Sequence, residues 1–153
     1  MANPVTQYIH ATEDLVTKTS TLLTTASAAE ISAGGTGWGT ETFSGTSEFQ
    51  LLLWLPELLT KHAGKPVCVI MYGGSAYENN PRRLAKLHII CMVENGVVRE
   101  TQEVTVRSLL DKVLKTLDDQ TDGHMKWEIE ADEPLDAYDT VAVLKLTFRV
   151  RDY

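Results

Sequence analysis

Histidine and cysteine, the side chains that most often bind metals or act as nucleophiles, are few and scattered in this chain. The four histidines are His10, His62, His88 and His124, and no two share the spacing of a metal-binding motif such as HExxH. His88 lies three residues before Cys91, but a strand would point these two side chains to opposite faces. We therefore expect no metal site at the histidines.

Cys68 and Cys91 both lie in apolar runs. Such a pair could form a disulfide or bind a metal, or it could be two small buried hydrophobic residues. Structural disulfides are rare in reducing compartments, and residues 1–15 lack the basic region and apolar core of a signal peptide. The expectation is two buried thiols in a protein made in the cytoplasm.

The motifs of nucleophilic catalysis, phosphate binding and calcium binding are incomplete. Ser44 and Ser75 do not lie in a Gly-x-Ser-x-Gly elbow. The glycine-rich segment 31–45 is not followed by Gly-Lys-Ser/Thr, and the acidic segment 132–139 lacks the ligand spacing and glycine of a calcium loop. The sequence therefore predicts no catalytic residue, no cofactor and no metal, and the protein is expected not to be an enzyme.

Size and charge narrow the possible partners. The chain has 153 residues, which suits a single domain over residues 1–153, and its net charge is −7. Tight binding of nucleic acid usually requires a basic surface, whereas an acidic protein can let DNA pass without holding it. The apolar run of residues 51–55 is too short to cross a bilayer, so no membrane partner is expected.

The helices that would position these side chains are indicated by hydrophobic periodicity. Residues 3–29, which begin with Asn-Pro, predict an amphipathic helix, and residues 105–117 predict the clearest helix of the chain. Residues 47–62 are ambiguous, because Pro56 would either kink one helix or separate a short strand from a following helix.

The strands are indicated by apolar runs and by alternation. Residues 66–72 form a continuous apolar run, which is typical of a strand covered on both faces. Residues 84–93, 125–131 and 140–151 alternate, and residues 75–83 form a polar loop. The positions of the second strand expected to face the core are Ala85, Leu87, Ile89, Cys91 and Val93, with Lys86 and His88 on the other face.

Residues 31–46 predict a flexible glycine-rich arm. Five glycines in residues 31–45 disfavour both a helix and a central strand. Trp38 and Phe43 within this arm could become ordered by docking on a neighbouring subunit. The fold class that follows is α+β: one two-layer domain with a mostly antiparallel sheet of about four strands, packed by two to three helices.

The outward positions of the last two predicted strands carry opposite charges. If these strands pair, Glu128 and Glu130 share a face with Lys145, Arg149 and Arg151, while Trp127 and Ile129 face the core. The charges could form ordinary cross-strand ion pairs, or they could contact another subunit. The apolar residues Ile90, Met92, Val141 and Val143 on the same outer face are typical of a covered surface.

The run PVCVIMYGGSAYE, its polar loop and the run RLAKLHIICMV resemble the tail-terminator proteins of long-tailed bacteriophages, including the minor tail proteins of Mu-like prophages. Those proteins similarly have a proline-led strand, a glycine-bearing turn, a polar loop, an Ala-x-Leu-x-Ile strand, an amphipathic helix and a closing strand. The resemblance covers residues 65–153, and residues 5–29 more loosely. The glycine-rich arm is longer than the link that the family would have there.

This resemblance implies a small α+β fold that closes into a homohexameric ring on the tail tube. The ring would stop tube polymerisation and present a surface to head-completion or neck proteins, while DNA passes through its lumen without specific binding. The protein would be assembled in the host cytoplasm and would lie at the head-proximal end of the tail in the virion.

The residues predicted to contact another subunit or a partner lie in the arm, in the polar loop and on outward strand positions. They are Trp38, Phe43, Tyr77, Glu78, Asn79, Asn80, Arg82, Arg83, Lys86, His88, Lys145, Arg149 and Arg151. Two alternatives stay open at this point. One is another head–tail joining or minor tail protein. The other is a small-molecule-binding or enzymatic α+β domain, with the arm acting as a lid over a pocket near Trp38.

Overall fold

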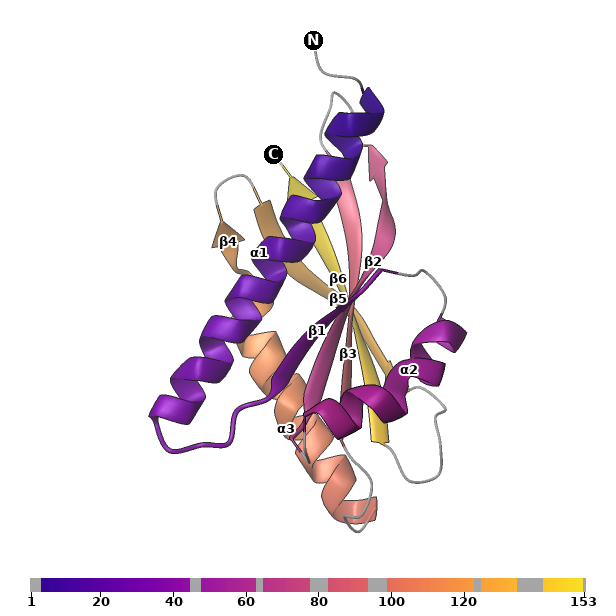
Figure 1. Cartoon of the computed structure of the whole chain (residues 1–153). Helices are drawn as coiled ribbons and strands as arrows, with labels where there is room; N and C mark the ends of the chain where they lie inside the picture. Colours follow the sequence, from indigo (N-terminus) through magenta and orange to yellow (C-terminus); the bar gives the residue numbers. More distant parts are fainter. Residues whose placement is uncertain are drawn as a thin grey trace.

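The structure is a computed structural model, and it describes residues 4–44, 48–62, 65–77, 83–93, 99–122, 125–134 and 142–152. The elements are, in chain order, α1 (Pro4–Ser32), β1 (Gly39–Phe43), α2 (Glu48–Lys61), β2 (Val67–Tyr77), β3 (Arg83–Val93), α3 (Arg99–Leu117), β4 (Thr121–Asp122), β5 (Met125–Pro134) and β6 (Ala142–Asp152) (Figure 1).

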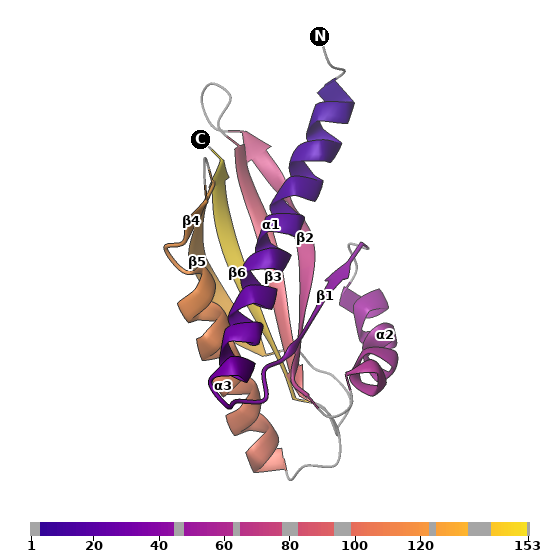
Figure 2. The same ribbon diagram turned by 60° about the vertical axis from the view of Figure 1, so that its left-hand side comes forward.

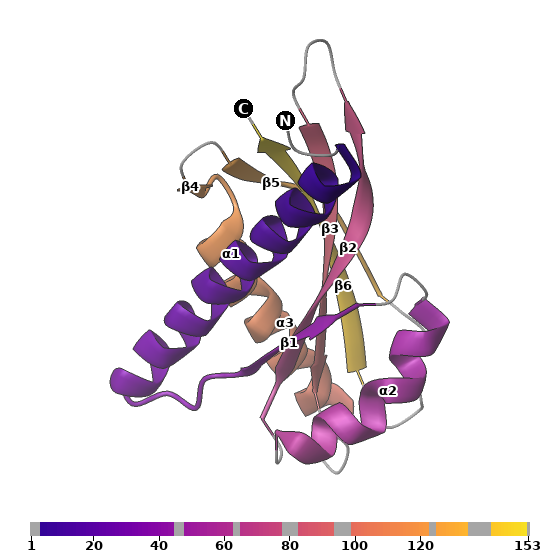
Figure 3. The same ribbon diagram turned by 45° about the horizontal axis from the view of Figure 1, so that its top comes forward.

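The strands form one sheet in the order β1-β2-β3-β6-β5-β4. β1 pairs with β2 in parallel, and the other neighbours pair antiparallel. Helices α1 and α3 lie on one face of the sheet, and α2 lies on the opposite face, towards one end (Figures 1 and 2). The tilted view shows α1 and α2 on opposite sides of the sheet (Figure 3).

The predicted α+β class is confirmed, but two details of the prediction are wrong. The sheet has six strands rather than about four, because β1 and the two-residue β4 were not predicted. Two layers describe only part of the sheet, since α2 adds a third layer over one end. Both extra strands are short, and strands of two to five residues carry too little alternation to stand out in a sequence.

The main core lies between the sheet and the helices α1 and α3. From β3 it contains all five residues predicted to face inwards, which confirms that part of the sequence interpretation. Helix α3 contributes five residues at helical spacing: Val106, Leu109, Leu110, Val113 and Leu117. Trp127 of β5 is fully buried here as predicted. Ile129 lies on the same inner face, opposite Phe148, but remains 36% exposed.

A second core lies under α2 on the opposite face. Leu51, Leu55 and Leu58 of this helix pack against the outward residues of the central strands, which are Val67, Val69, Met71, Ile90, Met92 and Val143. The continuous apolar run of β2 is thereby explained and confirmed, because alternate residues of that strand enter the two cores. The apolar outer residues of β3 and β6 are covered by the chain's own helix.

Helix α2 resolves the ambiguity of residues 47–62 in favour of one helix. Pro56 lies inside it, and the Thr60 hydroxyl donates a hydrogen bond to the Pro56 carbonyl at 2.9 Å. Phe49 and Leu53, one turn apart, point away from the core and are 69% and 59% exposed. The helix is therefore apolar on more than the face it buries.

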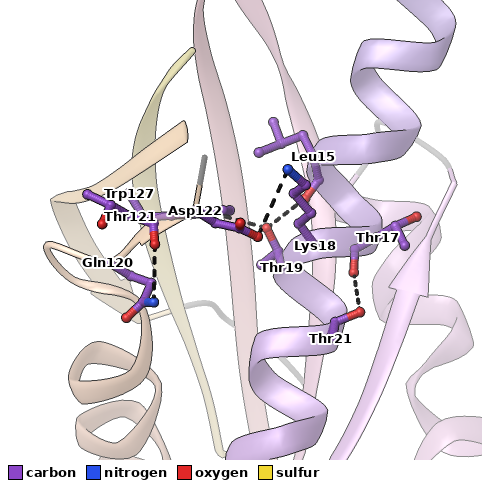
Figure 4. Close-up of polar contacts among 9 residues, drawn as sticks. All are labelled: Leu15, Thr17, Lys18, Thr19, Thr21, Gln120, Thr121, Asp122 and Trp127. Atoms are coloured by element: carbon purple, nitrogen blue, oxygen red, sulfur yellow. Dashed lines mark hydrogen bonds and ion pairs between the residues drawn. The ribbon is translucent and has the colours of Figure 1, made fainter. Parts of the chain in front are cut away.

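The side of α1 facing the sheet is tied to β5 by a buried polar link (Figure 4). The Trp127 indole N–H donates to the Thr19 hydroxyl at 3.0 Å, and Thr19 in turn donates to the Leu15 carbonyl at 2.8 Å. Lys18 lies 4.0 Å from Asp122 of β4 at the edge of the same contact. Each buried polar hydrogen in this link has an acceptor, which avoids the cost of an unpaired group.

The predicted flexible arm is wrong over Gly39–Phe43, which form the edge strand β1. The segment before it is held by α1, because the Ser27 hydroxyl both accepts from the Trp38 N–H and donates to the Trp38 carbonyl, each at 2.9 Å. Glu30 accepts from the Gly37 N–H at 2.8 Å. Tertiary contacts therefore order a segment that its glycines alone would leave free. Residues 45 and 46 lie outside the described residues.

The predicted polar loop 75–83 is shorter than expected. β2 continues to Tyr77 through a bulge between Tyr72 and Ser75, and β3 already begins at Arg83. Gly74 within the bulge has a φ of +97°, a conformation that favours glycine. The two glycines thus bend the strand rather than end it.

Candidate assembly interface

The outer surface of the sheet is not covered by α2 along its whole length. We call the part beyond the helix the open face. It is formed by alternate residues of β3, β6 and β5, which are Lys86, His88, Lys126, Glu128, Glu130, Glu133, Lys145, Thr147, Arg149 and Arg151.

The strand register divides the outer surface into rows of cross-strand partners. Along the strands, these rows change from apolar to charged residues. Under α2 lies the row of Met92 and Val143, and the next row pairs Ile90 with Lys145. The following row pairs His88 with Thr147. Beyond it, Lys86 pairs with Arg149, and the neighbouring β5 residue is Glu128. The surface therefore becomes polar where the helix cover ends.

Two glutamates of β5 each lie between two cations. Glu130 is 3.9 Å from Lys86 and 3.8 Å from Arg149, which are themselves direct cross-strand partners. Like charges placed directly opposite destabilise a sheet, so Glu130 offsets this repulsion.

The second group repeats the arrangement one row further along. Glu128 is 3.7 Å from both Lys126 and Arg151, which are also cross-strand partners. Lys126 additionally lies 4.0 Å from the exposed carboxylate of Asp119. In each of the two groups one carboxylate faces two cations, at distances longer than those of good hydrogen bonds.

Lys145 lies where the covered and open parts of the outer surface meet. Its side chain is only 11% exposed and its ammonium is 3.1 Å from Glu133. Over the whole open face, five cations face three glutamates, an excess of two positive charges. The chain as a whole, by contrast, has a net charge of −7.

His88 is held against the backbone of the β2 bulge. Its Nδ1 lies 3.1 Å from the Thr147 hydroxyl. A Cβ on Gly73 would lie only 2.6 Å from His88 Nε2, so glycine is required for this approach. Both contacts hold the imidazole on the sheet surface, in the row between apolar and charged residues.

The structure brings together five of the predicted interface residues. Lys86, His88, Lys145, Arg149 and Arg151 all belong to the open face.

The two predicted residues of the arm lie elsewhere. Trp38 is 7% exposed in the main core, so its predicted role as an exposed anchor for a neighbouring subunit is wrong. Phe43 is half-buried and packs on Trp54 of α2, with ring centroids 5.8 Å apart. Both aromatics dock on their own chain because β1 is part of the sheet.

Of the predicted interface residues in the polar loop, two lie within the described part of the chain. Tyr77 and Arg83 are the strand residues that pair at the end of β2 and β3. Glu78, Asn79, Asn80 and Arg82 lie outside the described residues.

A charged cluster between β1 and α2 was not predicted from the sequence. Glu41 accepts from Lys61 at 2.7 Å and lies 2.8 Å from His62 Nε2. A Cβ on Gly39 would overlap the His62 ring, so the imidazole rests on the strand backbone. Burial acts to raise the pKa of Glu41, but the hydrogen bonds and charges of Lys61 and His62 outweigh it and lower the pKa below its usual value of 4.5. Only the partners' positions in space reveal this cluster.

No protein-family model matches the chain, and a search of curated proteins finds no significant similarity. Within the part of the chain that the structure describes, no three histidine, cysteine, aspartate or glutamate side chains gather closely enough to hold a metal ion. Among the described helices, none combines the length and the apolar character needed to span a bilayer. The interpretation of the open face therefore rests on its own geometry.

Proposed function

We propose that this protein is a structural virion protein, a tail terminator that caps the tail tube as a homohexameric ring. The ring stops tube polymerisation and offers a joining surface to head-completion or neck proteins. The resemblance of residues 65–153 to that family motivates the assembly, and the α+β fold agrees with what the resemblance implies. The open face supplies the chemistry of the subunit contact.

The observation that carries the proposal is the pair of cation–glutamate–cation groups on the open face. Each places two cations around one glutamate at the surface of an acidic protein, and Lys126 of the second group also lies 4.0 Å from Asp119. The chain carries −7 although this face contributes +2, so the rest contributes −9. A ring needs two different surfaces that meet head to tail, and opposite charge on them favours that pairing.

The overall negative charge also suits a ring that DNA traverses. DNA is repelled by like charge, and weak binding along the lumen would let it pass. In this proposal the cations of the open face are occupied by the acidic surface of the next subunit. They are therefore not available to phosphates.

The nearest alternative is another head–tail joining or minor tail protein with the same kind of contact. The location of the protein in an intact particle separates the two, because a terminator lies at the head-proximal end of the tail tube. No observation favours the enzymatic alternative, since Trp38, the aromatic expected on a lid, packs in the core.

The proposal is tested by native mass spectrometry of the purified protein, alone and with tail-tube protein. We expect hexamers that dissociate as salt is raised, because exposed charge contacts are screened. The double variant Lys86→Glu, Arg149→Glu should shift hexamers to monomers. Its melting temperature should fall only modestly, since each exposed charge contact contributes about 0–1 kcal/mol, although Glu130 then faces two carboxylates.

The double variant Arg107→Glu, Lys115→Glu is the matched control, because it makes the same two charge reversals at exposed positions of α3, on the opposite side of the sheet. It should leave the hexamer intact. A wild-type protein that stays monomeric at every concentration, with and without tube protein, contradicts the proposal. So does a Lys86→Glu, Arg149→Glu variant that assembles as the wild type does.

A further inference from the structure

Cys68 of β2 and Cys91 of β3 are direct cross-strand partners. Both thiols are free, both residues are fully buried, and both belong to the main core, so their side chains share one face of the sheet. The sequence predicted two buried thiols rather than a disulfide or a metal pair. Their register places the two residues directly opposite each other.

The backbone geometry at this position suits a disulfide. Residues directly opposite in an antiparallel pair have Cα atoms about 4.5 or 5.5 Å apart. Disulfides accept Cα separations of about 4.4–6.8 Å. Opposite Cβ atoms are about 4.5–5.5 Å apart, and a disulfide holds them at about 3.5–4.5 Å. A bond between the two sulfurs therefore requires side-chain rotation and a small local approach of the two strands.

The surroundings of the two sulfurs differ. The Thr40 hydroxyl lies 3.6 Å from Cys68 Sγ, and the buried indole nitrogen of Trp38 has no hydrogen-bond partner among the described residues. Burial raises the pKa of Cys68 to about 12, although Thr40 and Trp38 act to lower it. At Cys91, burial and the neighbouring sulfur both raise the pKa well above its ordinary value. Of the two thiols, Cys68 is thus the one with hydrogen-bonding side chains, Thr40 and Trp38, near its sulfur.

We propose that Cys68 and Cys91 are a latent disulfide pair, which a peroxide oxidises within the folded chain. The Cys68 sulfur, as its thiolate, attacks one peroxide oxygen; the O–O bond breaks, and the leaving hydroxide takes up the thiol proton to form water. The Cys91 sulfur then attacks the Cys68 sulfenic acid. The S–O bond breaks, and a second water leaves with the Cys91 proton. Two thiols and one peroxide thus give one disulfide and two waters.

Access to this pair runs through β1. Thr40 is the cross-strand partner of Cys68 on the edge of the sheet, and Trp38 precedes it in the same segment. Oxidation therefore has to wait for β1 to separate transiently from β2, and both thiols are protonated near neutral pH. The expected reaction is slow, and faster at higher pH.

The experiment exposes the folded protein to hydrogen peroxide, blocks remaining thiols under denaturing conditions, and maps tryptic peptides without reduction. We expect the peptide containing Cys68 to be linked to the peptide containing Cys91 within one monomer. The oxidised protein should melt on the order of 5–10 °C higher than the reduced one. This readout does not depend on ring formation, so it is independent of the proposed function.

Cys91→Ala is the control variant, because it should leave Cys68 as a sulfenic acid with no linked peptide. Glu41→Gln, which weakens the attachment of β1 to α2, should shorten the time for linkage severalfold. Free thiols after prolonged exposure of the folded chain, or unlinked sulfinic acids at both positions, overturn the proposal. A linkage rate unchanged by Glu41→Gln overturns the assignment of β1 as the cover.

Discussion

Trp127 of β5 and Thr19 of α1, 108 positions apart in the chain, share a buried hydrogen bond of 3.0 Å. The bond joins a core aromatic to the helix that crosses the sheet, and the Thr19 hydroxyl passes its own hydrogen to the Leu15 carbonyl. The pair is a polar contact inside an otherwise apolar core, so its loss should be costly.

Thr19→Val should lower the free energy of unfolding by about 1–3 kcal/mol, because it leaves the Trp127 N–H buried without an acceptor. Urea denaturation followed by far-UV circular dichroism measures the change. Thr21→Val makes the same substitution two residues later, where the hydroxyl is exposed and donates to the Thr17 carbonyl. Equal losses in the two variants would show that the Trp127 bond contributes nothing.

Leu55→Ala should cost about 2–5 kcal/mol, because Leu55 is fully buried in the core under α2 and its removal leaves a cavity. Leu53→Ala is the matched control in the same helix, where 59% exposure predicts a change within about 0.5 kcal/mol. Thermal unfolding compares the two. If Leu53→Ala is the more damaging variant, α2 faces the sheet with its other side.

Gly39→Ala should destabilise the protein by about 1–3 kcal/mol, because the added methyl group overlaps the His62 ring. Combining it with His62→Ala removes the obstacle, so the cost of Gly39→Ala should fall in that background. A double-mutant cycle measured by chemical denaturation gives the coupling. Strictly additive effects would mean that the ring does not rest on Gly39.

Glu41→Gln should lower stability at pH 7 by roughly 1 kcal/mol, because an amide cannot replace the charged partner of Lys61 and His62. The folded pKa of Glu41 lies below its usual 4.5, so the carboxylate's stabilisation is present above pH 4.5 and is lost as the pH falls through the folded pKa. The stabilities of the variant and the wild type should therefore converge in acid. Unfolding measured from pH 7 downwards tests this, and a constant difference would exclude the linkage.

Alternation and helical spacing predicted the elements whose sides face one core. The inner residues of β3 and the buried face of α3 followed from this pattern, since each has one apolar and one polar side. The continuous apolar run of β2 likewise indicated cover on both faces. The sequence could not show that the second cover is α2, because helix placement depends on contacts between distant segments.

The charged residues of the open face were predicted only in part. Pairing of Glu128 and Glu130 with Arg149 and Arg151 followed from alternation, but Lys145 pairs with Glu133 instead. A bulge in β5 between Ile129 and Ala131 shifts the register by one residue. A shift of one residue turns the following side chains to the other face of the sheet, and no local sequence pattern indicates such a shift.

The position of β6 in the sheet has a consequence for the order of folding. β6 is the last strand of the described chain, yet it lies between β3 and β5 and pairs with both. During synthesis, β3 and β5 each keep an unpaired edge until residues 142–152 have left the ribosome. Exposed strand edges favour pairing with other chains. The nascent protein therefore passes through an aggregation-prone stage, which ends when β6 pairs with β3 and β5.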